Sequence, residues 1–192
     1  MKMERRIQKM TQLNKLLIDQ KDIFLAPGCY FHPEFNHDNY HLLPVPLQHR
    51  QNQKLIQRYS LGLPNENTQM LPDAVAQNWA QLPKVAWGLG VIQSPKPLPW
   101  WGELSQYQEL HSQLSHPLWQ VKNTLVATPQ TLLALGAWQL LTCLAPFCES
   151  YSARAKYMFS RSTQRLIDTS ENVLLPWNII EETCHYVRKN ST

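Results

Sequence analysis

The chain has 192 residues, of which 43% are hydrophobic and only 17% are charged, and its formal net charge at pH 7 is +4. This length is typical of one domain that buries its own core without disulfides. The basic residues form no patch interleaved with aromatic side chains, which argues against nucleic-acid binding, and the lack of an apolar run of about 18 residues argues against a transmembrane helix.

The N-terminus carries charges but no continuous apolar segment, so we expect no secretory signal and a chain that stays in the cytoplasm. Its four cysteines form no Cys-x-x-Cys pair, and in a cytoplasmic protein such spacing indicates free thiols. These cysteines are Cys29, Cys143, Cys148 and Cys184.

Residues 1–21 place aliphatic side chains at helical spacing, namely Ile7, Met10, Leu13, Leu16 and Leu17. This pattern predicts either a short amphipathic helix or a flexible tail that becomes ordered on a partner. We therefore treat 1–21 as an N-terminal unit and 22–192 as a helical adaptor domain.

The segment from Ile23 to Tyr40 is rich in aromatic residues and is interrupted by the turn signals Pro27-Gly28 and His32-Pro33. We expect it to be irregular and to pack on the helical body. Aromatic residues often anchor protein interfaces, so the residues of irregular segments are the candidate partner contacts. These candidates are Tyr30, His32, Phe35, Trp100 and Trp101.

The next part of the chain predicts two helices. One covers about residues 47–61, with Gly62 as its C-cap. After a loop, the other begins at Thr68 or Leu71 and ends at Gln81.

The stretch from Trp79 to Gly90 predicts a structural corner. Pro83 suits the first turn of a helix that continues to Ile92, because its missing N–H would have no partner there. With the preceding helix this gives an αα-hairpin, in which Gly88 and Gly90 allow close backbone packing. The corner residues are Trp79, Leu82, Pro83, Trp87 and Gly90, and both tryptophans are expected in the core.

Three prolines fix Ser94–Trp101 in an extended conformation. This segment is interpreted either as a rigid connector or as an exposed proline–aromatic docking strip. A helix over residues 102–115 follows. Thr128 and Pro129 are good N-cap and first-turn residues for a nearly all-apolar helix to Leu144, which belongs at the centre of the fold.

Two more helices begin at Pro146 and Pro176, and no segment shows a convincing strand pattern. We therefore predict an all-α fold: a single compact multi-helix domain with irregular aromatic and proline-rich segments.

Chemical motifs are sparse. His32, His37, His41 and His49 are close in sequence, and the i, i+4 spacing of His37 and His41 could hold a metal if this segment were helical. The alternative is that they are solvated loop histidines, since no HExxH motif accompanies them. The sequence has no GxSxG motif and no phosphate-binding loop. We expect no catalytic activity, no cofactor and no metal.

Three stretches resemble the SctK family (OrgA, MxiK, YscK) of type III secretion systems. They are Cys29-Tyr-Phe-His-Pro33, Trp79-Ala-Gln-Leu-Pro-Lys-Val-Ala-Trp-Gly-Leu-Gly90, and Leu132-Leu-Ala-Leu-Gly136 followed by Gln139-Leu140, Pro146, Glu149-Ser150 and Arg154. Their order and approximate spacing agree with the family over about residues 22–160.

The resemblance implies a cytoplasmic adaptor of the sorting platform, the assembly on the cytoplasmic side of the injectisome. Such proteins link the cytoplasmic domain of the inner-membrane ring protein SctD to SctQ, and through SctQ to the ATPase complex. They would reach the membrane only through protein contacts, and they contribute to virulence. Two alternatives stay open: a helical secretion chaperone or regulator that binds a secreted client, and a metal-dependent enzyme that uses the histidine cluster.

Overall fold

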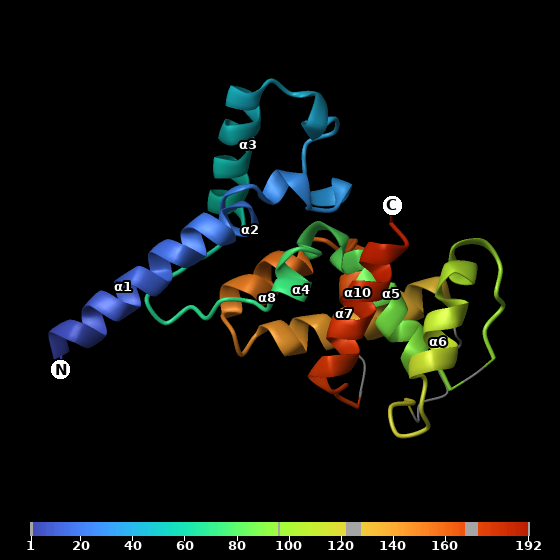
Figure 1. Ribbon diagram of the computed structural model, residues 1–192. Helices are drawn as coiled ribbons and strands as arrows, with labels where there is room; N and C mark the ends of the chain where they lie inside the picture. Colours follow the sequence, from blue (N-terminus) through green and yellow to red (C-terminus); the bar gives the residue numbers. More distant parts are fainter. Residues whose placement is uncertain (1, 96, 122–127, 168–172, 192) are drawn as a thin grey trace.

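Helices α5 (Leu82–Gln93) and α7 (Pro129–Leu144) lie against each other at the centre of the molecule (Figure 1). The computed structural model describes residues 2–95, 97–121, 128–167 and 173–191. Within these ranges the regular structure is entirely helical, which confirms the all-α prediction.

Glycines allow α5 and α7 to approach backbone to backbone. A Cβ atom on Gly90 would lie 1.9 Å from the carbonyl oxygen of Leu132, and one on Gly136 would lie 1.7 Å from that of Ala86. Any side chain at either position would separate the helices. The close packing expected of Gly90 is thus present, and its partner is the backbone of Leu132 in α7.

Helix α7 begins where the sequence predicts. The Thr128 side chain accepts a hydrogen bond from the backbone N–H of Thr131, and the Thr131 side chain accepts one from the backbone N–H of Thr128. This reciprocal capping box satisfies two N–H groups at the start of the helix. Leu132, Ala137 and Leu140 are buried, as expected for a central helix.

Other helices surround this pair. Helices α8 (Glu149–Lys156) and α9 (Arg161–Ile167) pack on α7, while α6 (Gln108–Leu114) and α10 (Trp177–Lys189) pack on α5. A 3₁₀ segment, Gly102–Tyr107, leads into α6, so the helix expected over 102–115 is part 3₁₀ and part α. The extended stretch predicted at Ser94–Trp101 has no helix in its described residues.

The N-terminal part of the chain forms a separate arm in Figure 1. Helix α1 (Lys2–Asp19) extends away from the body and carries the N-terminus at its tip, and α2 (Lys21–Leu25) joins it to the core. Three 3₁₀ turns follow before α3 (Val45–Arg58): Pro27–Cys29, Pro33–Phe35 and Tyr40–Leu42. Of the two expectations for residues 1–21, the helical one is observed for 2–19.

Arg154 connects this arm to the body. Its side chain is fully buried and donates hydrogen bonds to the carbonyl oxygens of Ile23 (3.1 Å), Phe24 (3.1 Å) and Gly62 (2.8 Å). It also donates to the Ser150 hydroxyl at 2.6 Å. A guanidinium with several donors can thus hold two separate pieces of backbone, Ile23–Phe24 and Gly62, against α8.

Three expectations at the boundaries of helices are wrong. The helix predicted to begin at Pro146 is α8, which begins at Glu149 after a turn. Helix α3 ends at Arg58 rather than near residue 61, and Ser60, with φ of 49°, takes the left-handed position that we assigned to Gly62. The N–H of Leu61 donates to the carbonyl of Ile56, and that of Ser60 to Gln57, which together form a Schellman ending.

The αα-hairpin predicted before Pro83 is also absent. In its place stand the four-residue helix α4 (Asp73–Ala76) and the 3₁₀ turn η4 (Trp79–Gln81), which continues directly into α5. The Asn78 side chain donates to the carbonyl of Ala74, the acceptor that the Asn78 backbone N–H would use in an α-helix. That N–H bonds to Val75 instead, and the helix stops.

Candidate partner-binding pocket

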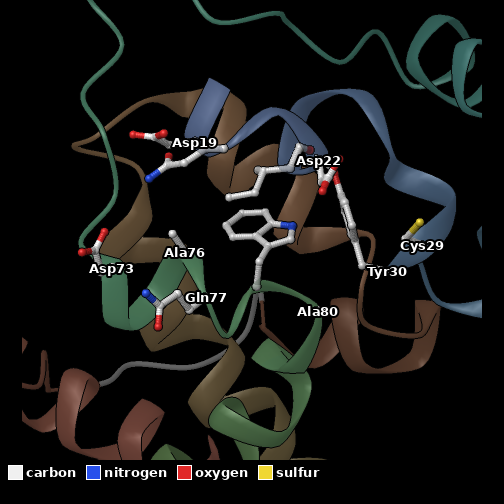
Figure 2. A pocket seen from close by; sticks show the side chains of 11 residues that line it. Asp19, Asp22, Cys29, Tyr30, Asp73, Ala76, Gln77 and Ala80 are labelled. Atoms are coloured by element: carbon white, nitrogen blue, oxygen red, sulfur yellow. Dashed lines mark hydrogen bonds between the residues drawn. The ribbon is translucent and has the colours of Figure 1, made fainter. Parts of the chain in front are cut away.

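A pocket of about 470 Å³ lies where the N-terminal arm meets the body (Figure 2). Its walls come from the junction of α1 and α2, from the segment Cys29–Tyr30, and from α4 and η4. In Figure 2, Asp19 and Asp73 lie on one side of it, and Tyr30 and Cys29 on the other. A volume in this range is typical of sites that take a small molecule or one or two side chains of a partner.

The aromatic wall of the pocket is formed by Trp79 and Tyr30. Their rings meet edge to face, with centroids 5.9 Å apart, and Trp79 is only 4% exposed. A hydrogen-bonding interaction of the Trp79 indole N–H with the Tyr30 side chain opposes the rise in the pKa of Tyr30 that burial causes. Among the described residues, however, no acceptor stands in hydrogen-bonding geometry to its buried Nε1–H. This nitrogen is enclosed by the protein itself, beside Tyr30.

Hydrogen bonds hold the wall in place. The Tyr30 hydroxyl donates to the carbonyl of Ile23, and burial raises the pKa of that hydroxyl well above its usual range. The buried Gln20 accepts a hydrogen bond from the Tyr151 hydroxyl at 2.8 Å and donates to the carbonyl of Leu71 at 3.0 Å. These contacts link the arm to α8.

Three carboxylates line the pocket: Asp19, Asp22 and Asp73. All three residues are exposed, and within the described part of the chain none forms a salt bridge. Arg188 of α10 donates to the side-chain oxygen of Gln77 in the lining, and Arg154 interacts with Tyr30 in the wall. The three aspartates are therefore solvated acidic side chains at the pocket, in a protein whose net charge is +4.

Two of the predicted contact residues lie inside the protein. Tyr30 and Phe35 are both buried, with Tyr30 in the pocket wall and Phe35 in an aromatic cluster with Tyr59 and Tyr157. Their rings serve packing in this conformation. His32 is half-buried, and its Nδ1 accepts a hydrogen bond from the backbone N–H of Glu34.

The two tryptophans of the proline-rich segment differ in exposure. Trp100 is half-buried against the core, with its ring 5.2 Å from that of His111. Trp101 is 75% exposed. Of the five predicted contact residues, Trp101 is the one whose ring is mostly available to a partner.

The corner residues divide between core and pocket. Leu82 and Gly90 are buried in α5, and Pro83 occupies its first turn as the sequence predicts. Trp79 packs against Tyr30 in the pocket wall. Trp87 is half-buried against the core, so it is less enclosed than we expected.

The histidine cluster is not gathered into a metal site. His37 lies in a loop, and His41 in a short 3₁₀ turn, so the helical i, i+4 geometry does not occur. Among the described residues, no three His, Cys, Asp or Glu side chains are placed to hold a metal ion together. This statement includes the three aspartates of the pocket.

The four cysteines are free, as their spacing indicates. Cys184 is buried, which raises the pKa of its thiol to about 12, and partial burial raises that of Cys143 to about 11. Cys29 is exposed and lines the pocket.

Comparison with protein families gives a match over residues 20–189 to the family described as bacterial type III secretion apparatus protein (OrgA_MxiK). The chain belongs to the OrgA/MxiK family. Comparison with curated proteins and with solved structures gave no match. The family match begins at residue 20, so α1 lies before it.

The stretches that carry the OrgA/MxiK resemblance meet in the fold. Gly90 and Gly136, from two of them, form the close contact of α5 with α7. The N–H of His32, from the first, donates to the carbonyl of Tyr157, one turn after Arg154. These motifs are therefore packing motifs, which hold the family fold together.

Sequence reasoning missed the acidic residues of the pocket. Asp22 and Asp73 are separated by fifty residues of chain, and neither belongs to a recognisable motif. One signal was present: Arg154 lies between the apolar positions Tyr151 and Ala155, and a charged residue on a buried face must be held by hydrogen bonds.

Proposed function

We propose that this OrgA/MxiK protein is an adaptor of the type III secretion sorting platform. It would link the cytoplasmic domain of the SctD-type ring protein to the SctQ-type platform protein, and so connect the membrane rings to the ATPase complex. The observation that carries the proposal is the family match over residues 20–189. In this role the protein binds other proteins and catalyses no reaction.

Two separate features of the surface support a protein with more than one partner. The exposed Trp101 lies after the proline-rich segment, and the acidic pocket lies at the junction of arm and body. Aromatic side chains and desolvated charge pairs are the usual anchors of interfaces. Two distinct anchors are what a linking protein requires.

The proposed location is the cytoplasmic face of the inner membrane, reached through protein contacts. None of the helices in the described residues is both long and apolar enough to cross a membrane. The contact with the SctD-type cytoplasmic domain would hold the protein there.

The test is co-expression of the full chain with the SctD-type cytoplasmic domain, with the SctQ-type protein, and with both, each from the same operon. Size-exclusion chromatography of each mixture should give a binary complex with either partner and a ternary complex with both. Trp101→Ala should weaken one binary complex, and Leu118→Ala, which removes another strongly exposed apolar side chain, is the matched control.

A chain that elutes alone in all three mixtures would contradict the adaptor role. A deletion strain provides the second measurement, because loss of an adaptor should abolish secretion while the membrane rings still assemble. Normal secretion in that strain would overturn the proposal. Recovery of one secreted protein in place of the two platform proteins would favour the chaperone alternative.

A further inference from the structure

We propose that α3 docks an acidic helix of a partner polypeptide. Its surface has two parts: a basic stripe along the exposed face of the helix, Arg50, Lys54 and Arg58, and an apolar tip at its N-terminal end, Leu42, Val45 and Leu47. Carboxylates of the partner would pair with the basic stripe, and apolar side chains at one end of the partner helix would cover the apolar tip. Which partner supplies this helix rests on the proposed adaptor function, while the chemistry of the surface does not.

The apolar tip is the first observation. Leu42 is 80% exposed, Val45 61% and Leu47 47%, although the three lie close together in the chain. Large apolar side chains gathered on a protein surface mark places where another molecule binds. In Figure 1, α3 rises from α2 with its N-terminal end away from the body, so the tip is open to a partner.

Hydrogen bonds hold the tip in this position. The buried Asn52 of α3 accepts a hydrogen bond from the backbone N–H of Gly28 at 2.8 Å and donates one to the Tyr40 hydroxyl at 2.9 Å. The Tyr40 ring is buried as well, and Gly28 leaves room for it, since a Cβ atom there would overlap the ring. The tip is therefore exposed by a packed part of the structure and not by a loose end.

The basic stripe is the second and independent observation. Its residues are spaced four apart and so share one face of α3, with Leu47 three residues before them on that face. All of them are exposed, whereas Asn52 and Leu55 on the opposite side of the helix are buried. At a rise of about 1.5 Å per residue the stripe is about 12 Å long. Three cations thus lie in a row that begins at the apolar tip.

The charge of the stripe is not neutralised within the described part of the chain. No carboxylate there forms a salt bridge with Arg50, Lys54 or Arg58, and α3 contains no Asp or Glu. Residues 1–60 hold nine Lys and Arg and five Asp and Glu, whereas residues 61–192 hold nine of each. The net charge of +4 is therefore carried by the part of the chain that contains α3. An acidic partner supplies the complementary charge.

The two observations together select a polypeptide helix over other acidic partners. A helix that lies on a lipid surface needs a broad apolar face toward the lipid, but the apolar side of α3 is turned toward α2 and the 3₁₀ turn Pro27–Cys29. Single-stranded nucleic acid binds through stacked aromatic side chains as well as phosphates, and the stripe contains no aromatic residue. Carboxylates one turn apart on a helix match cations one turn apart, and a polypeptide also supplies apolar side chains for the tip.

A designed peptide tests this chemistry without either platform protein. The probe is an end-capped, fluorescein-labelled helical peptide with glutamates one turn apart along one face and leucines at one end of that face. Its binding to the full-length protein is followed by fluorescence anisotropy. We expect saturable binding that weakens as salt is added, because salt screens exposed charges. A peptide with glutamines in place of the glutamates should bind about tenfold more weakly, since charge-assisted hydrogen bonds are the stronger kind.

Charge reversal locates the binding on the stripe. The triple variant Arg50→Glu, Lys54→Glu, Arg58→Glu should weaken binding of the glutamate peptide about tenfold or more. The matched control has the same net charge and reverses three exposed cations outside α3: Lys21→Glu, Lys156→Glu and Arg165→Glu. At physiological ionic strength the control should bind the peptide within about twofold of the unaltered protein, because distant charges are screened. All the substituted side chains are exposed, so both variants should keep the melting temperature of the unaltered protein.

The apolar tip has its own test. Leu42→Ser with Leu47→Ser should weaken binding of the glutamate peptide several-fold and should leave binding of a peptide without the leucines unchanged. The matched control is Leu63→Ser with Leu118→Ser, which removes two exposed leucines outside the tip. This control should bind both peptides as the unaltered protein does.

Four results would overturn the proposal. The first is no saturable binding of the glutamate peptide. The second is equal weakening by the stripe variant and by its matched control. The third is binding of phosphatidylglycerol vesicles that depends on the stripe more strongly than peptide binding does, which would make α3 a lipid-binding surface. The fourth is a dimer of the unaltered protein that the stripe variant converts to a monomer, because the partner would then be a second copy.

The same variants separate this proposal from the adaptor function. In the co-expression experiment the stripe variant should lose one of the two binary complexes, and the matched control should keep both. If the peptide binds through the stripe but neither platform protein forms a complex, the adaptor function fails and the assignment of α3 stands. If the platform complexes form but the peptide does not bind, the assignment of α3 alone fails.

Discussion

Arg154 is a buried charge without a buried countercharge. In the described residues no carboxylate is within salt-bridge distance of it, and its donors are spent on carbonyl oxygens and one hydroxyl. Its guanidinium also lies 5.1 Å from the centre of the Phe24 ring. Burial lowers the pKa of this guanidinium, yet an arginine keeps its charge in proteins. The residue therefore acts as a cross-link made of hydrogen bonds.

Replacement of this cross-link should destabilise the fold. We expect Arg154→Leu to lower the free energy of unfolding by about 3 kcal/mol, because buried carbonyls lose their donor and the guanidinium site is left unfilled. Arg154→Lys should recover only part of this loss, since one ammonium cannot reach acceptors on three segments. Urea unfolding measures both, and the exposed Arg165→Leu is the control. If the two Arg154 variants were as stable as the control, the proposed role of Arg154 as a cross-link would be contradicted.

His111 makes stability depend on pH. Burial beside Trp100 lowers the pKa of the imidazole below its ordinary 6.5. Below pH 6.5 the folded state thus binds fewer protons than the unfolded state. The stability gained from burying the neutral imidazole is therefore fully present above both pKa values and is lost as pH falls below 6.5. When the pH is lowered from 7.5 to 5, the melting temperature of the His111→Gln variant should fall less than that of the unaltered protein. An identical loss in both proteins would exclude this effect.

At the scale of whole elements, two glycines determine how closely α5 and α7 pack. Each glycine faces the backbone of the opposite helix, so the two positions set the distance between the helix axes. Gly136→Ala should lower the free energy of unfolding by about 3 kcal/mol, since overpacking of a rigid contact forces the helices apart. Gly62→Ala is the control, because its added Cβ would meet only a side-chain oxygen at 3.7 Å. Thermal and urea unfolding report both.

The sequence predicts correctly those helix starts that are determined by a capping residue or a proline within one turn. Thr128 and Pro129 determine the start of α7, and Pro176 that of α10, because capping and proline geometry act within one turn. Helices that end through tertiary contacts were missed. Asn78 stops α4 with its own side chain, and Ser60 takes a left-handed conformation more typical of glycine. Neither event leaves a clear pattern in the sequence.

The candidate pocket could be predicted only in part, for a similar reason. Trp79 belongs to a motif that the sequence analysis singled out, but the three aspartates come together only through the fold. Partner contacts were expected from exposed aromatic residues in irregular segments. Irregular segments can be buried, as Tyr30 and Phe35 are. Trp101 satisfies both conditions, since it is irregular and exposed.

At the scale of the whole molecule, few of the described side chains of α1 contact the rest of the chain. Leu16 is 1% exposed, Gln20 is buried, and Lys9 contacts Asn67 and Glu66, while Ile18 is 73% exposed. The described side chains of α1 otherwise face solvent for the most part. The helix is therefore attached at its C-terminal end.

This attachment predicts a strong contrast within one helix. Leu16→Ala should lower the free energy of unfolding by about 2–4 kcal/mol, because it opens a cavity where arm meets body. Ile18→Ala, an aliphatic truncation two residues away, should change it by less than about 0.5 kcal/mol. Hydrogen exchange of the α1 amides after each substitution gives the local readout. Similar effects of both substitutions would mean that α1 packs differently.

The bonds of Arg154 also impose an order on the biosynthesis of the chain. The carbonyl of Ile23 and its donor on Arg154 are 131 residues apart. At roughly 5–20 residues per second, the ribosome delivers that donor on the order of ten seconds after the acceptor. Until then the aromatic N-terminal arm has no completed site on the body. A nascent chain that stalls before Arg154 therefore exposes this arm, which makes truncated products substrates for proteases and chaperones.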